Sequence, residues 1–562
     1  MARMSQTETT HASIDRRSFF KGAGAIGLGV AAAAATGCAP SAPTAQESLS
    51  QTGSAPAEES GAEGAGYYSP ATSVNAKEPT DGEVAFEAEP VAADQITETL
   101  DCDLLVIGAG IAGICAAASA VQNGLSVVLL EKTSTYQIQA GEIGAVGGKV
   151  LDAAGLSADP VEYYNEAMEH ASYRCDGDVW QVYIDRSGEA IDWFEDEIVA
   201  GACGAWNPSS AADRFANGIN WRATVIAPEA GVPEAVGVAF QYCIDHGADV
   251  RLETPAVQLV TASDGSVTGA IAKDKDGNYI QVNAPATLLA TGGYCHNVQM
   301  MQERIRPRDM LCYSWLDARM GDTGDGHLMG LAVGAAEDDF PHAMMNDSSG
   351  ALSGGAFSCA VLSMMRVNER GERFVNEDLA LNFLANTIAY QPGSHDWCLA
   401  DANVEEMTRV MLGGIEGFDV SGMLDPFMAD AVECASVAEL ASVIGCDEAT
   451  LQATLDRYNE LCEKGADDDF HKTARNMIKI DTPPFYAFEE GPANLSTVNG
   501  LRVNAQSQVL NENMEPIAGL YASGNVSGSM FSDTYTHHLA GVSTGRAVTF
   551  GYLLGRRLAG VE

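Results

Sequence analysis

The sequence is poor in positive charge and lacks the short cysteine motifs that mark metal and haem sites. Only 31 lysines and arginines stand against 77 aspartates and glutamates, so the net charge at pH 7 is −46. Because nucleic-acid binding depends on clustered basic side chains, this balance argues against a nucleic-acid partner. The 13 cysteines form no C-x-x-C pair and no C-x-x-C-H motif. Neither a metal site, an iron–sulfur cluster nor covalent haem therefore has local sequence support.

A long apolar run is also missing, because residues 22–35 are only weakly apolar and too short for a membrane span of about 20 residues. This run follows the pair Arg16-Arg17, and together they resemble a twin-arginine export signal. The end of the segment, A-T-G-C, resembles a lipobox whose cysteine is Cys38, although alanine replaces the commoner leucine. We expect residues 1–38 to be a signal and the mature protein to be extracytoplasmic. Cys38 is either lipid-anchored to the membrane or lost in a simple cleavage.

Residues 39–95 are rich in Ser, Ala, Thr, Glu, Gly and Pro and contain few large apolar side chains. Such a composition cannot bury enough surface to offset the entropy of ordering, so we expect a disordered tether. The rest of the 562 residues, with 46% apolar composition overall, can form two or three domains with a large core. The excess acid indicates a solvated surface, or an electrostatic match to a basic redox partner.

Three glycines in the spacing G-x-G-x-x-G follow the short apolar run 103–107, which we expect to be a buried parallel strand. Gly108 permits the tight turn, Gly110 lets the backbone approach a pyrophosphate, and Gly113 lets helix and strand pack closely. An ordinary tight turn would explain the glycines alone.

The residues after the glycines complete a dinucleotide fingerprint. Residues 111–123 are alanine-rich and suit a helix whose N-terminus faces the phosphates. Residues 126–130 form the second expected strand, and Glu131 at its tip lies about 20 residues after the first glycine, as the ribose-binding acid should. Strand, helix, strand and acid agree, so the sequence predicts a bound dinucleotide.

A second glycine-rich stretch, residues 140–148, makes the resemblance specific. The chain resembles the FAD-dependent fumarate reductase and succinate dehydrogenase flavoprotein superfamily, which includes 3-ketosteroid dehydrogenases. The family's G-G-N-S-x-x-x-G-G segment maps onto this stretch, with Glu142-Ile143 in place of Asn-Ser. The resemblance implies an α/β fold, in which a Rossmann-like FAD-binding domain of the glutathione-reductase type carries an inserted α+β capping domain. The histidine that attaches FAD covalently in succinate dehydrogenases has no counterpart, so we expect non-covalent FAD.

Four further segments match the family in the expected order: 251–260, 288–297, 323–326 and 501–551. The resemblance thus implies a FAD-binding domain in two parts, 101–340 and 481–562, with the cap at 341–480 between them. The amphipathic run 450–464 predicts a helix in the cap. The residues expected to bind FAD are Gly108, Ala109, Gly110, Ile111, Ala112, Gly113, Glu131, Lys132, Thr133, Gly141, Ile143, Gly144, Ala256, Thr291, Gly292, Asp325, Gly524, Asn525 and Ser543.

The groups that handle a dicarboxylate in fumarate reductases are replaced in this sequence. The family's proton-donating arginine should stand four residues after Glu377, where this chain has Leu381. The segment that supplies a substrate-binding histidine reads L-S-T-V-N-G at 495–500, and the usual N-R-L-G-G is replaced by Y-T-H-H-L-A-G at 535–541. The resemblance therefore does not extend to fumarate or succinate as substrate.

Tyr535, His538 and His537 are the candidate catalytic residues. Tyr535 lies where ketosteroid dehydrogenases place a tyrosine that hydrogen-bonds the substrate carbonyl. A phenol with a reference pKa of about 10 is protonated at neutral pH and can donate to a developing enolate. The imidazole of a histidine has a reference pKa of about 6.5, so it can act as a general acid near neutral pH. Alternatively, the three side chains line a turn and satisfy backbone groups.

Three other residues are further candidates for the site. Tyr294 follows the A-T-G-G turn and is expected to be a core aromatic residue rather than a catalytic one. His342 lies where the cap should begin. Arg373, in the cap motif G-E-R-F-V-N-E, is expected to pair inside the cap. The sequence offers no metal site.

These features predict an exported FAD-dependent reductase that saturates an activated carbon–carbon double bond. Without a carboxylate clamp, a neutral enone such as a steroid, or a plant phenolic, is a better candidate substrate than a small diacid. Electrons would come from a quinol-linked or multihaem cytochrome donor. The alternatives are a ketosteroid desaturase on the same scaffold and a surface lipoprotein that binds a ligand and uses FAD structurally.

Overall fold

The computed structural model describes residues 75–76, 81–138, 141–208, 225–310, 314–316, 321–350, 362–379, 381–411, 424, 428, 431–532, 534–536, 539 and 541–562. The expected signal at 1–38, with Cys38, and most of the expected tether lie outside these residues. No helix within them combines the length and apolarity needed to cross a bilayer.

A six-stranded sheet forms the centre of the nucleotide-binding region, in the order β19-β20-β12-β3-β4-β8. All neighbouring pairs in it are parallel except β19 and β20, which form an antiparallel pair. Strands β3, β4 and β12 are buried along their whole length, as parallel strands covered on both faces are. The strands are β3 (Leu104–Ile107), β4 (Val127–Leu130), β8 (Asp249–Arg251), β12 (Ala286–Leu289), β19 (Gln508–Leu510) and β20 (Pro516–Ala522).

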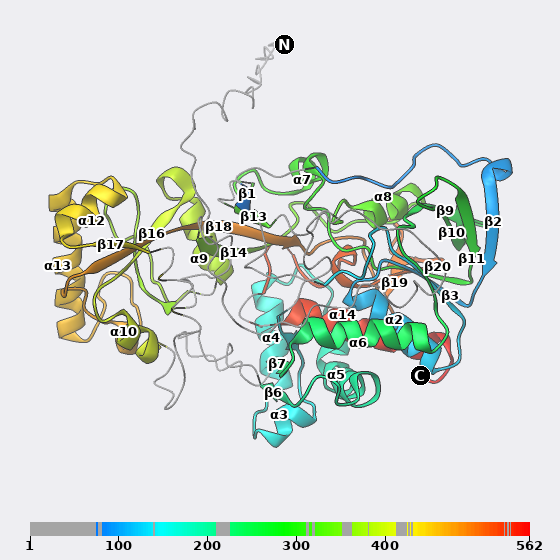
Figure 1. Cartoon of the computed structure of the whole chain (residues 1–562), viewed down its shortest axis with the longest axis horizontal. Helices are drawn as coiled ribbons and strands as arrows, with labels where there is room; N and C mark the ends of the chain where they lie inside the picture. Colours follow the sequence, from blue (N-terminus) through cyan, green and yellow to red (C-terminus); the bar gives the residue numbers. More distant parts are fainter. Residues whose placement is uncertain are drawn as a thin grey trace, which may run out of the picture. The chain divides into compact units, whose positions relative to one another are not determined.

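Helix α2 (Ile111–Gln122) packs against both α14 (Val542–Leu558) and α6 (Val232–Asp245), and the three lie side by side in Figure 1. Two glycines of α14 allow this contact. A Cβ atom on Gly551 would lie 2.8 Å from the carbonyl oxygen of Ala112, and one on Gly555 would lie 2.5 Å from Ser119 Oγ. The other helices of this region are α3 (Lys149–Ala153), α4 (Pro160–His170), α5 (Gly177–Trp193), α7 (Val298–Arg304) and α8 (Asp325–Ala332).

Two smaller sheets accompany the central one. The first has the order β2-β11-β10-β9 and comprises β2 (Ile96–Asp101), β9 (Ala256–Thr261), β10 (Val267–Lys273) and β11 (Tyr279–Asn283). The second comprises β5 (Ile143–Gly144), β6 (Trp206–Pro208) and β7 (Val225–Pro228). The family-like segment 251–260 is not one continuous strand, because the chain leaves β8 at Arg251 and starts β9 at Ala256 in another sheet. Glu253, with a φ of 51°, and Pro255, which has no N–H, account for the break.

The end of the expected tether, residues 81–95, differs from the expectation because it is held on the nucleotide-binding region. Glu87 accepts a hydrogen bond from Lys273 Nζ at 2.8 Å and another from the Tyr279 hydroxyl at 2.8 Å. The amides of Ala85 and Phe86 donate to Asp325 Oδ1 at 2.7 and 3.2 Å. Polar pairing, which the composition of the segment does not reveal, holds it together with the packing of Phe86 against the core. We call residues 81–95 the strap.

The cap is built on a seven-stranded sheet whose long strand β18 (Phe485–Thr497) pairs with four others. Its other strands are β1 (Asn75–Ala76), β13 (Ser314–Leu316), β14 (Met344–Gly350), β15 (Met365–Val367), β16 (Asp396–Ala400) and β17 (Val432–Cys434). Its helices are α9 (Leu381–Ala389), α10 (Val404–Met411), α12 (Val437–Ile444) and α13 (Glu448–Lys464), the last confirming the amphipathic helix expected at 450–464. Strand β18 lies beyond the boundary expected at residue 480, yet it pairs within the cap sheet.

Candidate active site

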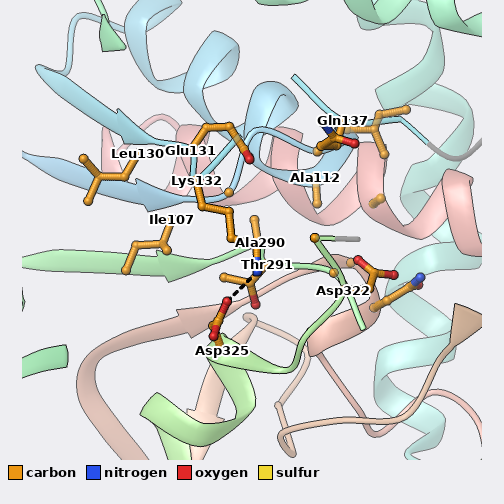
Figure 2. A pocket seen from close by; sticks show the side chains of 18 of the residues that line it. Ile107, Ala112, Leu130, Glu131, Lys132, Gln137, Ala290, Thr291, Asp322 and Asp325 are labelled. Atoms are coloured by element: carbon orange, nitrogen blue, oxygen red, sulfur yellow. Dashed lines mark hydrogen bonds and ion pairs between the residues drawn. The ribbon is translucent and has the colours of Figure 1, made fainter. Parts of the chain in front are cut away.

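A cavity opens where the strands of the central sheet end (Figure 2), and it holds about 1090 Å³ of space free of protein atoms when the open solvent at its mouth is included. Its walls come from β3, α2, β4, the turn after β12, α8, the segment after β20 and the start of α14. The expected cofactor residues that line it are Gly108, Gly110, Ile111, Ala112, Glu131, Lys132, Ala256, Thr291, Gly292, Asp325, Gly524, Asn525 and Ser543.

The glycine turn has the geometry of a phosphate-binding site. Gly108 has a φ of +107°, and a Cβ atom there would lie 2.4 Å from the carbonyl oxygen of Ala290. A Cβ atom on Gly113 would lie 2.0 Å from the carbonyl oxygen of Gly108, so α2 can approach β3 only with glycine at this position. A Cβ atom on Gly110 would come no closer than 3.8 Å to another protein atom, and no side chain caps the first turn of α2. The first amides of this helix can therefore bind an anion in the cavity.

Glu131 is buried at the tip of β4, and Figure 2 shows its side chain among those that line the cavity. Its Oε2 accepts the amide of Ala109 at 2.8 Å, and its Oε1 accepts the amide and the hydroxyl of Thr133, each at 2.8 Å. A carboxylate has about four acceptor positions, so one remains on Oε2 for a ribose hydroxyl. Ala109 and Thr133 thus hold the carboxylate and do not line the cavity.

Lys132 and Asp325 form an ion pair of 2.7 Å across the cavity wall, which the dashed line in Figure 2 marks. Lys132 Nζ also donates to Thr323 Oγ1 at 2.6 Å. Because the other carboxylate oxygen of Asp325 accepts the two strap amides, this pair connects β4, α8 and the strap. Asp325 therefore ties the strap to the wall of the cavity.

The opposite part of the cavity is lined by Gly524, Asn525 and the N-terminus of α14. Asn525 Oδ1 accepts a hydrogen bond from Ser543 Oγ at 3.1 Å, and Asn525 Nδ2 donates to Ser496 Oγ at 2.8 Å. Nearby, Thr291 Oγ1 is buried and has no hydrogen-bond partner in the part of the chain that the structure describes. An unsatisfied hydroxyl at a cavity wall fits a polar ligand.

Three expected cofactor residues of the second glycine-rich stretch do not line the cavity. They are Gly141, Ile143 and Gly144. Ile143 is buried in β5, and the amide of Gly144 donates to the carbonyl oxygen of Gly541 at 2.9 Å. Gly141 has no other atom within 4 Å of the position of a Cβ. The segment therefore supports the start of α14, because a Cβ atom on Gly541 would lie 2.5 Å from Gly144 N.

Comparison with known proteins identifies the ligand of this cavity. A family model described as an FAD-binding domain matches residues 103–542. The chain belongs to this FAD-binding family. Its cofactor is therefore FAD, and the expected α/β fold is confirmed.

Individual relatives are distant but match along most of the chain. The vinyl phenol reductase of Lactiplantibacillus plantarum is 27% identical over 492 residues, covering 81% of this chain and 96% of the relative. The probable fumarate reductase Ifc3 of Shewanella frigidimarina is 29% identical over 467 residues, covering 81% and 74%. Among solved structures, the 3-ketosteroid-delta4-(5alpha)-dehydrogenase of Rhodococcus jostii RHA1 has a TM-score of 0.65 at 23% identity, covering 84% of this chain and 99% of that one. At this identity the structural likeness shows the fold alone.

The polar groups are consistent with one direction for FAD in the cavity. Glu131 and the first turn of α2 would hold the adenosine ribose and the pyrophosphate. The wall formed by Asn525 and Ser543 would then face the ribityl chain and the flavin ring, and we call it the flavin end of the cavity. The α14 N-terminus presents its positive dipole end there, which favours negative charge on the ring. No cluster of metal-binding side chains occurs among the residues that the structure describes.

Tyr535 is buried beside this flavin end of the cavity. Its hydroxyl oxygen accepts a hydrogen bond from the backbone amide of Ser543 at 3.1 Å, and its ring packs against Phe531 at 5.0 Å. Burial raises the pKa of Tyr535 to about 12, so the phenol stays protonated at neutral pH. The other two catalytic candidates, His537 and His538, lie outside the described residues.

Leu381, where the family's proton-donating arginine should stand, begins α9 and is buried in an apolar cluster with Val375, Leu384 and Ile388. The next residue, Asn382, donates to Thr534 Oγ1 at 3.1 Å and so connects α9 with the segment that carries Tyr535. No acid or base replaces the arginine at this position.

The remaining candidates have structural partners. Arg373 donates to both oxygens of Glu377, at 2.8 and 2.7 Å, and to Asp467 at 2.7 Å, which confirms the expected pairing inside the cap. Tyr294 is fully buried, and its hydroxyl lies 2.7 Å from His342 Nδ1. Burial lowers the pKa of His342, which favours a neutral imidazole.

Several lining residues carry no signal in the sequence. Among them are Gln137 and Ile138, which follow Glu131 in the sequence, and Asp322, Met329 and Thr544. Gln137 is placed by its backbone, whose amide donates to the carbonyl oxygen of Ala109 at 3.0 Å. Only the folded path of the chain brings these ordinary residue types to the cofactor.

Proposed function

We propose that the protein is an FAD-dependent oxidoreductase of CH–CH bonds that reduces an activated, uncharged carbon–carbon double bond. Bound reduced FAD supplies the hydride. The chain excludes water with its cap, presents the positive end of α14 to the flavin end of the cavity, and places the protonated phenol of Tyr535 beside it.

The observation that carries this proposal is the apolar environment of Leu381. A fumarate site must hold two carboxylates and deliver a proton, and an arginine meets both needs. In this chain the position is buried among aliphatic side chains. The replaced histidine segment offers no substitute, because Asn499 is occupied inside the protein by the amide of Ala343, the carboxylate of Asp338 and the carbonyl oxygen of Phe531.

Relatives named for a vinyl phenol and for fumarate both match this chain, so the family allows either substrate class. The loss of the dicarboxylate groups favours the phenolic or enone class. The deciding experiment is anaerobic. The purified protein is reduced with dithionite, the excess reductant is removed, and fumarate, urocanate, a vinyl phenol, cinnamates and an enone steroid are added separately.

We expect a neutral alkene to restore the spectrum of oxidised flavin and fumarate to leave the flavin reduced. Fast reoxidation by fumarate would overturn the proposal. If a saturated ketosteroid instead bleaches the oxidised protein, the desaturase is the correct assignment. If no alkene reoxidises the reduced protein, the flavin has a structural role and the chain is a binding lipoprotein.

We further propose export by the twin-arginine route, attachment to the membrane only through Cys38, and a basic cytochrome or quinol-linked protein as the electron donor. The paired Arg16-Arg17, the lipobox-like cysteine and the net charge of −46 support this. Cell fractionation of the protein and its Cys38→Ala variant tests the anchor, since the variant should move from the membrane to the soluble extracytoplasmic fraction. Retention of both in the cytoplasm would overturn the export proposal.

A further inference from the structure

Arg546 is a fully buried cation that has no acidic partner among the residues that the structure describes. It lies in α14, and only 2% of its surface is exposed. Its guanidinium donates to the carbonyl oxygens of Ser527 and Val498 at 3.3 and 3.2 Å, and to Asn525 Oδ1 at 3.2 Å. Among the residues that the structure describes, none of its hydrogen bonds goes to a carboxylate, and its Nε has no hydrogen-bond partner.

The groups around this cation do not cancel its charge. The ring of Phe531 lies 4.7 Å from the guanidinium carbon and gives a cation–π contact. Tyr535 is a neutral phenol, and the buried carboxyl of Asp338 attracts Arg546 only from a distance. Burial lowers the pKa of Arg546 to about 10, so it is still charged at neutral pH. An unpaired charge in the interior is unfavourable unless something else compensates it.

The position of Arg546 indicates what compensates it. Asn525 Oδ1 receives hydrogen bonds from both Arg546 and Ser543, and both Asn525 and Ser543 line the flavin end of the cavity. Arg546 thus lies directly behind a residue of the cavity wall, on the same helix whose positive end faces the cavity. The cation and the dipole together make this wall electropositive.

We propose that Arg546 is a positioning residue that holds Asn525 and stabilises the negative charge that FAD acquires on reduction. Two electrons and one proton convert oxidised FAD into the anionic reduced form, and an external donor supplies the electrons. The negative charge then lies against the wall that Arg546 polarises. Arg546 thereby raises the reduction potential of the bound flavin and favours the anionic over the neutral reduced form. This inference rests on FAD alone, so it can fail separately from the choice of alkene.

Substitution by methionine tests the proposal, because it keeps the length and removes the charge. In Arg546→Met with FAD bound, we expect the reduced flavin to bind at least tenfold more weakly relative to the oxidised flavin. This lowers the two-electron midpoint potential by about 30 mV or more. Arg546→Lys keeps the charge and should retain most of the potential. The matched control is Arg557→Met, at the other end of the same helix, which should not change the potential.

A second probe needs no turnover. Sulfite adds to the flavin ring nitrogen N5 and leaves the adduct negatively charged, so the same wall should stabilise the adduct. We expect the dissociation constant for sulfite to rise about tenfold in Arg546→Met and to stay unchanged in Arg557→Met. If Arg546→Met holds FAD as tightly as the native chain and keeps its potential and its sulfite affinity, Arg546 merely ties backbone carbonyls together and the proposal is wrong.

A measurement on the native protein decides the matter even if Arg546→Met does not fold. Uptake of one proton with two electrons changes the potential by about 30 mV per pH unit around neutral pH, whereas uptake of two protons changes it by about 59 mV. We expect the smaller slope. The larger slope would show that the reduced flavin is neutral, which leaves no anion for Arg546 to stabilise.

Discussion

The hydroxyl of Tyr535 lies 3.1 Å from the backbone amide of Ser543 and accepts its hydrogen bond. Ser543 is in the first turn of α14 and lines the flavin end of the cavity. One phenol therefore holds the helix terminus that faces the flavin in the proposed orientation of FAD, and it lies where a proton donor for the substrate is expected. The two roles give separate signals when the hydroxyl is removed.

Tyr535→Phe should affect both stability and turnover. Loss of the hydrogen bond to α14 should lower the free energy of unfolding by about 1 kcal/mol. Loss of the acid should lower kcat with the best alkene by at least about 100-fold while FAD stays bound. Urea unfolding and stopped-flow reoxidation measure the two effects. Tyr183→Phe removes another buried hydroxyl of the same aromatic cluster and should leave kcat unchanged. An unchanged kcat in Tyr535→Phe would remove this residue from the chemistry.

The glycines at 108 and 110 should respond differently to alanine. Gly110 has a φ of −79° and no protein atom closer than 3.8 Å to a Cβ position, so the apoprotein should tolerate Gly110→Ala. The methyl group would occupy space of the pyrophosphate, and the affinity for FAD should fall tenfold or more. At Gly108 the positive φ and the 2.4 Å contact mean that alanine disturbs the fold itself. Calorimetric titration with FAD and urea unfolding of the apoproteins separate these outcomes. Equal FAD affinity in Gly110→Ala and the native protein would contradict the pyrophosphate assignment.

Short sequence patterns predict the parts of the fold that depend on contacts between residues close together in the chain. The strand, glycine turn and helix from Leu104 to Gln122 follow from spacing, because the positive φ of Gly108 and the packing of Gly113 are requirements of that turn alone. The helix α13 follows from its amphipathic repeat.

Long-range pairing was not predictable in the same way. The strap depends on Glu87 meeting Lys273, 186 residues away, and composition alone made the segment look unable to order. The lack of an ion pair for Arg546 within the described residues is equally invisible in the sequence, since an arginine near other polar residues gives no sign of which partners folding will bring to it. Both features arise from contacts that exist only after the sheets and helices have assembled.

Arg366 in the cap should be among the most sensitive positions for stability. It is fully buried and pairs with Asp396 and Glu490, each at 2.7 Å. Arg366→Met leaves two buried carboxylates without their cation, which costs about 3–5 kcal/mol. The exposed pair of Arg409 and Glu405 gives the control, since Arg409→Met should cost less than about 1 kcal/mol.

The loss in Arg366→Met should depend on pH in a defined direction. Burial raises the pKa of Asp396 to about 6 in the native cap. Near pH 6 this acid is therefore partly protonated in the folded state, whereas it is charged in the unfolded chain. Removing Arg366 raises that pKa further. The folded variant then binds more protons than the unfolded one, so its stability falls as pH rises through 6. Urea unfolding should therefore show a larger loss at pH 8 than at pH 5, and equal losses would contradict the charged state of this cluster.

The strap should retain FAD, and two of its anchors can be removed separately. Asp325→Ala removes the acceptor of the Ala85 and Phe86 amides as well as the partner of Lys132, so it changes both the strap and the cavity wall. Glu87→Gln weakens the other anchor, the contacts with Lys273 and Tyr279, without touching the cavity.

Two lost hydrogen bonds of about 1 kcal/mol each should speed FAD release roughly tenfold or more in Asp325→Ala. If the strap itself holds the cofactor, Glu87→Gln also speeds release, measured from the rise of free FAD fluorescence after dilution. Glu98→Gln, which removes an exposed contact with Arg251 outside the strap, serves as the control. If FAD release is faster in Asp325→Ala but unchanged in Glu87→Gln, the cavity wall and not the strap retains the cofactor. Limited proteolysis of residues 81–95 in Glu87→Gln would then show whether the strap had opened.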